Sequence, residues 1–118
     1  MEGFWTFEFA GIRGWGDGVV PLMAGQAFGG DSTFLYDGTY ADDGITLNAR
    51  MHVKRYVSLG IMPIPSVMGR EEFDLEITGT LLGSTIQVTG VIPGTQLRLT
   101  GTLKKQRDLP PTKMGNVA

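Results

Sequence analysis

A threonine-glycine pair recurs every eleven residues in the C-terminal half of the chain. The three pairs are Thr78-Gly79, Thr89-Gly90 and Thr100-Gly101. Eleven residues make about one strand and one tight turn, so the repeat predicts similar antiparallel strands. Each glycine shares its face with apolar residues, and an inward glycine serves where a sheet must bend or where something needs room. The repeat therefore predicts a sheet that curls around an interior that side chains do not fill.

Alternating apolar and polar residues predict eight strands. They cover residues 4–9, 16–23, a short segment that ends at 31, 34–41, 45–54, 72–81, 85–91 and 96–104. Eight short strands joined mostly by tight turns avoid exposed sheet edges best by closing into a barrel, which holds side chains or one small ligand. We predict an all-β, eight-stranded, antiparallel up-and-down barrel at residues 1–106 and a flexible C-terminal tail at 107–118. The positions predicted to face inward include Trp5, Phe7, Phe9, Ile45, Leu47, Ala49, Met51, Val53, Phe73, Leu75, Ile77, Val88, Leu97 and Leu99.

The composition argues against several classes of function. The 118 residues include no cysteine, so no disulfide framework or thiol chemistry is expected. A net charge of −2 provides no general basic field, so no nucleic-acid partner is expected. No apolar run approaches the ~20 residues of a membrane helix. The first three residues also lack the positive start of a signal peptide. We therefore expect a cytoplasmic protein with no membrane association.

Several short motifs follow one another in a recognisable order. They are an aromatic opening strand, Gly16-x-Gly18-Val19-Val20, Gly29-Gly30-Asp31, Tyr36-x-Gly38-x-Tyr40, Val53-x-Arg55-Tyr56 and the Thr-Gly strands. In order and spacing they resemble the GrlR-like family, which is named for a negative regulator of type III secretion. The resemblance implies a small lipocalin-like barrel, often dimeric, that binds and restrains a transcriptional activator.

In that family an acidic run in the loop before the long strand is associated with binding of the activator. The corresponding loop here is Ala41-Asp42-Asp43-Gly44. Asp42 and Asp43 are therefore candidate partner-binding residues. The alternative is that Asp43-Gly44 forms a hairpin turn and that Asp42 is its solvated neighbour.

The connection at residues 57–70 is long and apolar, although it contains two prolines. Loops of this length are usually functional or disordered, and disordered ones are rarely so apolar. Three interpretations stay open: a lid over a barrel mouth, a contact that joins a homodimer, and a satellite core beneath the loop. The candidate ligand-binding residues in the cavity and lid are Trp5, Phe7, Met51, Leu59, Ile61, Met62, Ile64, Met68, Gly79, Gly90 and Gly101.

Catalytic and metal chemistry have little support in the sequence. The single histidine, His52, faces outward between Arg50 and Lys54, whose charges would disfavour its protonated form. Without a histidine pair, a cysteine or calcium-loop spacing, neither a metal ligand nor a cofactor is expected. The basic residues of this strand are instead expected to pair with Asp74 and Glu76 on the next strand.

The expected function is non-enzymatic. The sequence favours a small regulatory or binding protein that holds a small apolar ligand, a protein partner, or both. The alternative is a negative regulator of the GrlR-like kind, whose barrel is filled and which acts purely through protein-protein interaction.

Overall fold

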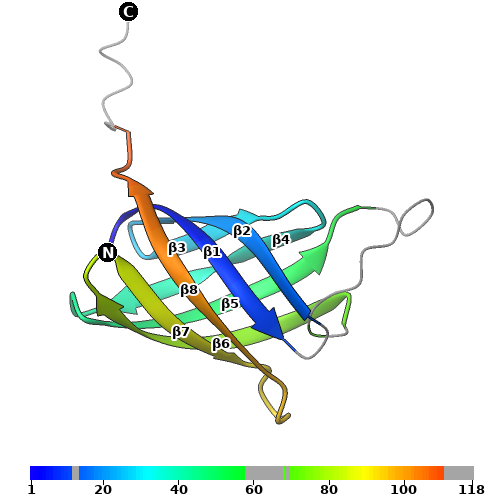
Figure 1. The fold of residues 1–118 in the computed structure, drawn as a ribbon. Helices are drawn as coiled ribbons and strands as arrows, with labels where there is room; N and C mark the ends of the chain where they lie inside the picture. The colour runs from blue at the N-terminus through cyan, green and yellow to red at the C-terminus, as the bar shows by residue number, and fades with distance from the viewer. Residues whose placement is uncertain (12–13, 58–67, 69, 111–118) are drawn as a thin grey trace, which may run out of the picture.

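The computed structural model describes residues 1–11, 14–57, 68 and 70–110 as an eight-stranded antiparallel barrel. The strands are β1 (Gly3–Gly11), β2 (Gly14–Met23), β3 (Gln26–Gly30), β4 (Phe34–Asp42), β5 (Thr46–Arg55), β6 (Glu72–Leu82), β7 (Thr85–Val91) and β8 (Arg98–Arg107). Each strand pairs with the next in the chain, and β8 pairs with β1 to close the barrel (Figure 1). The predicted fold class is confirmed: this is an all-β, up-and-down barrel consistent with a lipocalin-like architecture. Strand β8 runs one residue past the expected limit of the domain at 106, and residues 111–118 of the predicted tail lie outside the described residues.

Period-two alternation places one face of most strands inside the barrel. Along β5, for example, Leu47, Met51 and Val53 are buried while the residues between them point outward. The core draws on every strand of the barrel. It includes five residues of β2, β3 and β4 that the sequence pattern did not identify: Val20, Leu22, Ala27, Phe34 and Tyr36.

Two residues predicted to face inward do not belong to strands. Ile45 is 64% exposed because it lies in the turn before β5, where its amide donates to Asp43 Oδ1 at 2.9 Å. Leu97 precedes β8 and is only partly buried against the core. The predicted strand began at Ile45, one residue before β5 begins. The prediction that Ile45 faces inward is therefore wrong.

The charge pairing expected across the outer ladder of β5 and β6 is confirmed for Arg50, whereas Lys54 lies opposite Glu72 and Arg55 is paired with Glu71. Arg50 lies opposite Glu76 with a 3.2 Å ion pair, and His52 lies opposite Asp74. Such cross-strand pairs stabilise a sheet modestly, by about 0.2–1 kcal/mol each.

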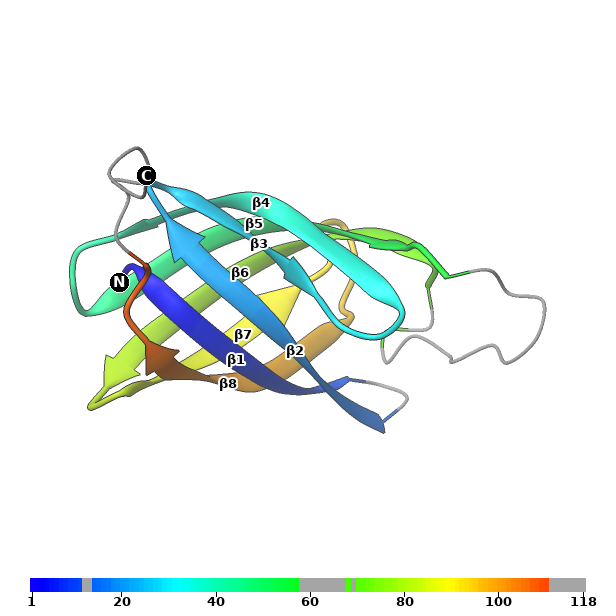
Figure 2. The same cartoon turned by 90° about the horizontal axis from the view of Figure 1, so that it is seen from above.

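The connections alternate between two ends of the barrel (Figures 1 and 2). The N-terminal end carries Met1, Glu2 and the β2–β3, β4–β5 and β6–β7 turns. The mouth end carries the β3–β4 turn and the ends of β1, β5 and β7. The two ends can therefore have different chemistry although the same strands run between them.

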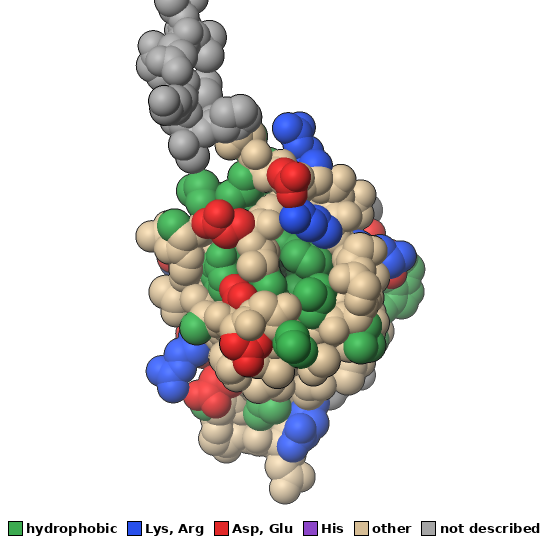
Figure 3. Space-filling view, turned by 90° about the vertical axis from the view of Figure 1, so that its left-hand side faces the viewer, with side chains coloured by type: hydrophobic (Ala, Val, Ile, Leu, Met, Phe, Trp, Pro, Cys, Tyr) green, Lys and Arg blue, Asp and Glu red, His purple; other side chains and the backbone are tan. Residues whose placement is uncertain are grey.

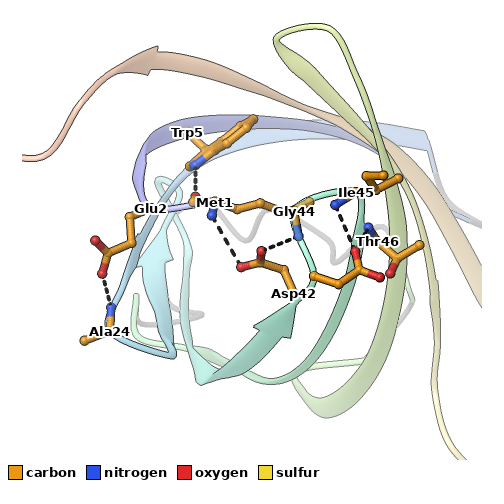
Figure 4. A network of polar contacts seen from close by, with 9 residues as sticks. Met1, Glu2, Trp5, Ala24, Asp42, Gly44, Ile45 and Thr46 are labelled. Carbon is orange, nitrogen blue, oxygen red and sulfur yellow. Dashed lines mark hydrogen bonds and ion pairs between the residues drawn. The ribbon is translucent and has the colours of Figure 1, made fainter.

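The N-terminal end is covered by a polar network (Figure 4). The indole Nε1 of Trp5 donates to the Met1 carbonyl at 3.0 Å, and the Met1 ammonium lies 3.3 Å from Asp42 Oδ2. The Ala24 amide donates to Glu2 Oε2 at 2.7 Å. In space-filling view, acidic side chains border apolar ones on this end (Figure 3). The network ties the residues that precede β1 to two hairpin turns.

Candidate functional site

The barrel encloses a cavity of about 200 Å³. Its wall is apolar over most of its length and draws on all eight strands. The wall residues are Phe7, Phe9, Val20, Leu22, Ala27, Phe34, Leu47, Ala49, Met51, Val53, Phe73, Leu75, Ile77, Val88, Leu99 and Leu103. Ala27 and Ala49 are small residues of this wall. A larger side chain at either position would reach into the space that the cavity occupies.

The rim of the cavity, at the mouth end, is polar and aromatic. It is formed by Trp15, Gly16 and Asp17 of β2, by Asp31, Ser32 and Thr33 of the β3–β4 turn, and by Tyr36 of β4. Trp15 is 76% exposed, whereas Tyr36 is buried. The cavity thus combines an apolar body with hydrogen-bonding groups at one end, an arrangement typical of small-molecule sites.

Asp31 organises this rim. Its Oδ1 accepts hydrogen bonds from the amides of Thr33 and Phe34, both at 2.8 Å, which holds the β3–β4 turn. Its Oδ2 accepts a 2.5 Å bond from the hydroxyl of Tyr36. An aspartate that opens a turn commonly bonds the amides that follow it. Here the second oxygen also fixes an inward-facing phenol.

The environment of Tyr36 keeps its hydroxyl protonated. Burial raises the pKa of this phenol far above its usual value, and the hydrogen bond to Asp31 and the charges of Asp31 and Asp17 raise it further. A phenol in this state donates a hydrogen bond and does not serve as a general base. The rim therefore suits binding better than proton abstraction.

The end of β5 is attached to the same rim. The Tyr56 amide donates to Thr33 O at 3.0 Å, and the Tyr56 hydroxyl donates to Asp31 O at 2.9 Å. Arg55 lies over the Phe34 ring at 5.0 Å, and its Nε is paired with Glu71. The apolar connection therefore departs from the mouth end of the barrel.

Four of the predicted lid residues, Leu59, Ile61, Met62 and Ile64, lie outside the described residues. The fifth, Met68, is 1% exposed and belongs to the main core. It does not line the cavity among the residues that the structure places there. Met68 itself thus packs in the main core, whereas the lid, dimer-contact and satellite-core interpretations concern residues outside the described part of the chain.

The predicted cavity residues are only partly brought together. Phe7 and Met51 line the cavity. Trp5 is buried but takes part in the network at the N-terminal end. The three repeat glycines are absent from the described lining.

The expectation that these glycines leave inward positions empty is wrong. A Cβ added at Gly79 would lie 2.8 Å from methyl carbons of Ile86 and Val88, and one at Gly90 would lie 3.2 Å from Leu99 Cγ. At Gly101 it would collide with the ring of Phe7. Neighbouring side chains occupy the space that the glycines leave, and the room in the barrel lies elsewhere.

Asp42 and Asp43 bond their own turn. Asp42 Oδ1 accepts from the Gly44 amide at 2.8 Å. Asp43 Oδ1 accepts from the amides of Thr46 at 2.7 Å and Ile45 at 2.9 Å, and these bonds hold the pKa of the Asp43 carboxyl below its usual range. Both carboxylates are thus explained by turn chemistry, although Asp43 stays exposed.

The predicted electrostatics of His52 are wrong. Its Nδ1 lies 2.7 Å from Asp74 Oδ1 and its Nε2 lies 2.6 Å from Glu72 Oε2. The hydrogen bonds to Asp74 and then Glu72 raise the pKa of His52, so the protonated form is favoured. Cross-strand acids at hydrogen-bond distance outweigh Arg50 and Lys54, which neighbour His52 only along its own strand.

The sequence alone does not identify the rim as a unit. Gly29-Gly30-Asp31 and Tyr36 stand out in it as fold motifs and not as parts of a site. One signal was present: an aspartate at a turn, followed five residues later by a tyrosine on the apolar face of the next strand. That spacing places a phenol near a carboxylate only when β3 and β4 form a hairpin, as they do here.

Comparison with known proteins finds no matching family model and no matching curated protein. Within the described part of the chain, no group of three or more histidine, cysteine, aspartate or glutamate residues is arranged to hold a metal ion. The same part contains no helix with the length and apolarity needed to span a membrane.

Proposed function

We propose that this protein is a non-enzymatic binding protein that takes a small apolar molecule into its barrel. The observation that carries the proposal is the apolar cavity of about 200 Å³ with its polar rim at one end. Dry apolar cavities of ~150 Å³ accept benzene in other proteins, and sites for drug-sized molecules start near ~300 Å³. The ligand is accordingly a molecule of one or two rings, or a short hydrocarbon chain. The cytoplasmic setting and the regulatory role expected from the sequence belong to the same proposal.

Propylbenzene is a suitable neutral probe for this function. Binding to the wild type is measured by isothermal titration calorimetry, with an expected Kd below about 1 mM, or at least ~4 kcal/mol of binding free energy. Ala49→Leu places three more carbons at the cavity wall and should abolish binding in a folded protein. Ala41→Leu is the matched control, because Ala41 is exposed and faces outward on the neighbouring strand. If folded wild type takes up no propylbenzene, or if Ala49→Leu binds it as well as wild type does, the proposal fails.

A second candidate function is protein-protein interaction, as in the regulator that the sequence resembles. The observation that favours it is an outer apolar face formed by Val19, Phe28 and Leu35, which are 48%, 37% and 53% exposed. Val19 and Leu35 flank Gly30 across the ladder, so the three strands share this face. Exposed apolar patches often mark interaction sites.

The sequence predicts a homodimer, so the first test of this candidate function is a measurement of the oligomeric state. Sedimentation at ~100 μM should show a dimer, since a modest Kd suffices at that concentration. Phe28→Lys with Leu35→Lys should give a folded monomer if the outer face is the interface. Ile61→Asp with Ile64→Asp should do so if the apolar connection is the interface. A monomeric wild type would contradict both versions of the dimer.

A further inference from the structure

The charged residues that the structure places at the rim of the cavity are all of one sign. Asp17 and Asp31 line it, and within the described part of the chain no lysine, arginine or histidine does. The residue opposite Asp17 on β1 is Glu8, another acid, whose own ion pair is with Lys104 of β8 at 4.0 Å. No ion pair joins Asp17 to another described residue. Among the described residues, the cavity lining therefore carries negative charge only.

The field of these carboxylates reaches the inside of the barrel. Asp31 contacts the Tyr36 hydroxyl at 2.5 Å, and Tyr36 is 8% exposed with its ring on the inward face of β4. Burial is the largest cause of the raised pKa of this phenol, but the charges of both Asp31 and Asp17 contribute to it. Two carboxylates thus act on a group that lines the cavity, where low polarity strengthens their effect.

The rim also offers an aromatic surface. Trp15 lines the cavity and leaves 76% of its surface exposed at the mouth. A cation within about 6 Å of a tryptophan face is attracted by the ring, and aromatic surfaces are a common means of holding organic ammonium groups. Asp17 and Asp31 line the same rim as this indole, so carboxylates and an aromatic ring that both attract a cation lie at one end of the cavity.

We propose that the cavity selects small molecules with an organic ammonium group, whose apolar part fills the barrel while the charged nitrogen lies at the rim among Asp17, Asp31 and Trp15. This inference rests on the proposed function, because it assigns the chemical class of the ligand for the same cavity. Molecules whose polar end is a carboxylate are disfavoured there. They would bring a third negative charge to the rim and would lose hydration without gaining an opposite charge.

Three probes of nearly equal size separate charge from apolar fit: phenethylamine, propylbenzene and 3-phenylpropanoate. Each is titrated into the full chain at pH 7 by calorimetry. We expect phenethylamine to bind at least about tenfold more tightly than 3-phenylpropanoate, with the affinity of propylbenzene between them. This difference is the size expected from one contact between a cation and an aromatic ring with carboxylates nearby. Raising the salt concentration should narrow this difference, because the rim is partly exposed.

Two charge-removing variants test the named residues. Asp31→Asn keeps a side-chain oxygen that accepts from the Thr33 and Phe34 amides, so the turn is retained. Asp17→Asn removes a charge that takes part in no described ion pair. It provides the test of rim charge if Asp31→Asn proves to be unstable. Each variant should weaken phenethylamine binding about three- to tenfold more than it weakens propylbenzene binding. Asp37→Asn is the matched control, because Asp37 is exposed on the outer face of β4.

The outcomes separate the inference from the function beneath it. Preference for the amine that both rim variants reduce, and that Asp37→Asn retains, supports the proposal. If propylbenzene binds but the amine binds no better than the carboxylate, the ligand class is overturned while the binding function stands. If the amine preference persists in both rim variants, the assigned residues are wrong. If none of the three probes binds to folded protein, the binding function itself fails.

Discussion

Gly101→Ala tests whether the inward glycines of the repeat leave space or are needed for close packing. Gly101 lies in β8 opposite Phe9 of β1, at the seam where the barrel closes. A Cβ built there meets a ring carbon of Phe7 and lies 2.5 Å from the carbonyl oxygen of Glu8. The oxygen belongs to the backbone, and the Phe7 ring is buried against Phe9 with centroids 4.9 Å apart. The backbone oxygen cannot move away cheaply, so the alanine must push β8 from β1.

The expected cost follows from two opposing terms. Overpacking a filled core costs about 1–3 kcal/mol. Replacing a strand glycine by alanine returns about 0.5–1 kcal/mol, because the unfolded chain loses less freedom. The midpoints of these ranges give a net destabilisation of about 1 kcal/mol, within limits of about 0–2.5 kcal/mol. For a chain of 118 residues this should lower Tm by roughly 4 °C per kcal/mol.

Urea unfolding followed by circular dichroism measures this difference, with Gly90→Ala as the matched comparison. The Cβ of Gly90→Ala would lie 3.2 Å from Leu99 Cγ and 3.5 Å from Leu75 Cδ2, so small side-chain shifts can accommodate it. Its stability should stay within about 1 kcal/mol of wild type. If Gly101→Ala is as stable as wild type or more so, the inward position is empty after all. The account of barrel closure given above would then be wrong.

Three further predictions concern the wall, the outer ladder and the buried phenol. Leu75→Ala should cost about 2–5 kcal/mol, since Leu75 is buried beside an existing cavity, whereas exposed Leu82→Ala should cost little in the same urea assay. The raised pKa of His52 stabilises the fold fully below its unfolded value of about 6.5, and this contribution is lost as pH rises through the folded pKa. Wild type should therefore lose stability above pH ~6.5 relative to His52→Gln, and equal pH profiles of the two proteins would contradict the ion pairs with Asp74 and Glu72. In an alkaline absorbance titration, fewer than the three tyrosines should ionise near pH ~10 while the protein is folded, and Tyr36→Phe should leave the native curve unchanged. A reduced amplitude in Tyr36→Phe would mean that this phenol is accessible.

Most of the architecture follows from local patterns in the sequence. Alternation along β5 and β6 and the turns at Asp43-Gly44 and Gly83-Ser84 specify the β4–β5 and β6–β7 hairpins, whose partners are neighbours in the chain. Strand faces follow from the period of two, and a one-residue change of register would expose every core residue of a strand. For this reason eight strands and most of the inward residues were predicted correctly. One error, Ile45, fell at a strand end, where the turn geometry decides the orientation, and the inward residues that were missed lie in β2, β3 and β4.

The electrostatics of the site depended on pairs that sequence distance conceals. His52 is 22 residues from Asp74, and only the register of β5 with β6 brings the two within hydrogen-bond distance. Asp31 and Tyr36 are five residues apart, but their contact requires the hairpin between β3 and β4. The sequence shows which charges neighbour His52 along its own strand. The direction of its pKa shift, however, is set by the acids on the neighbouring strand.

The interior volume was decided by the tertiary structure alone. Sequence patterns identify which residues face inward, but a cavity is the difference between the enclosed volume and the side chains that fill it, contributed by strands far apart in the chain. At the closing seam the ring of Phe7 occupies the space beside Gly101, although the two residues lie at opposite ends of the sequence. The remaining room lies instead beside Ala27 and Ala49 and below the rim at Asp31. Which inward gap is filled depends on how neighbouring side chains pack after the barrel has closed, and the alternation of residues carries no information about that packing.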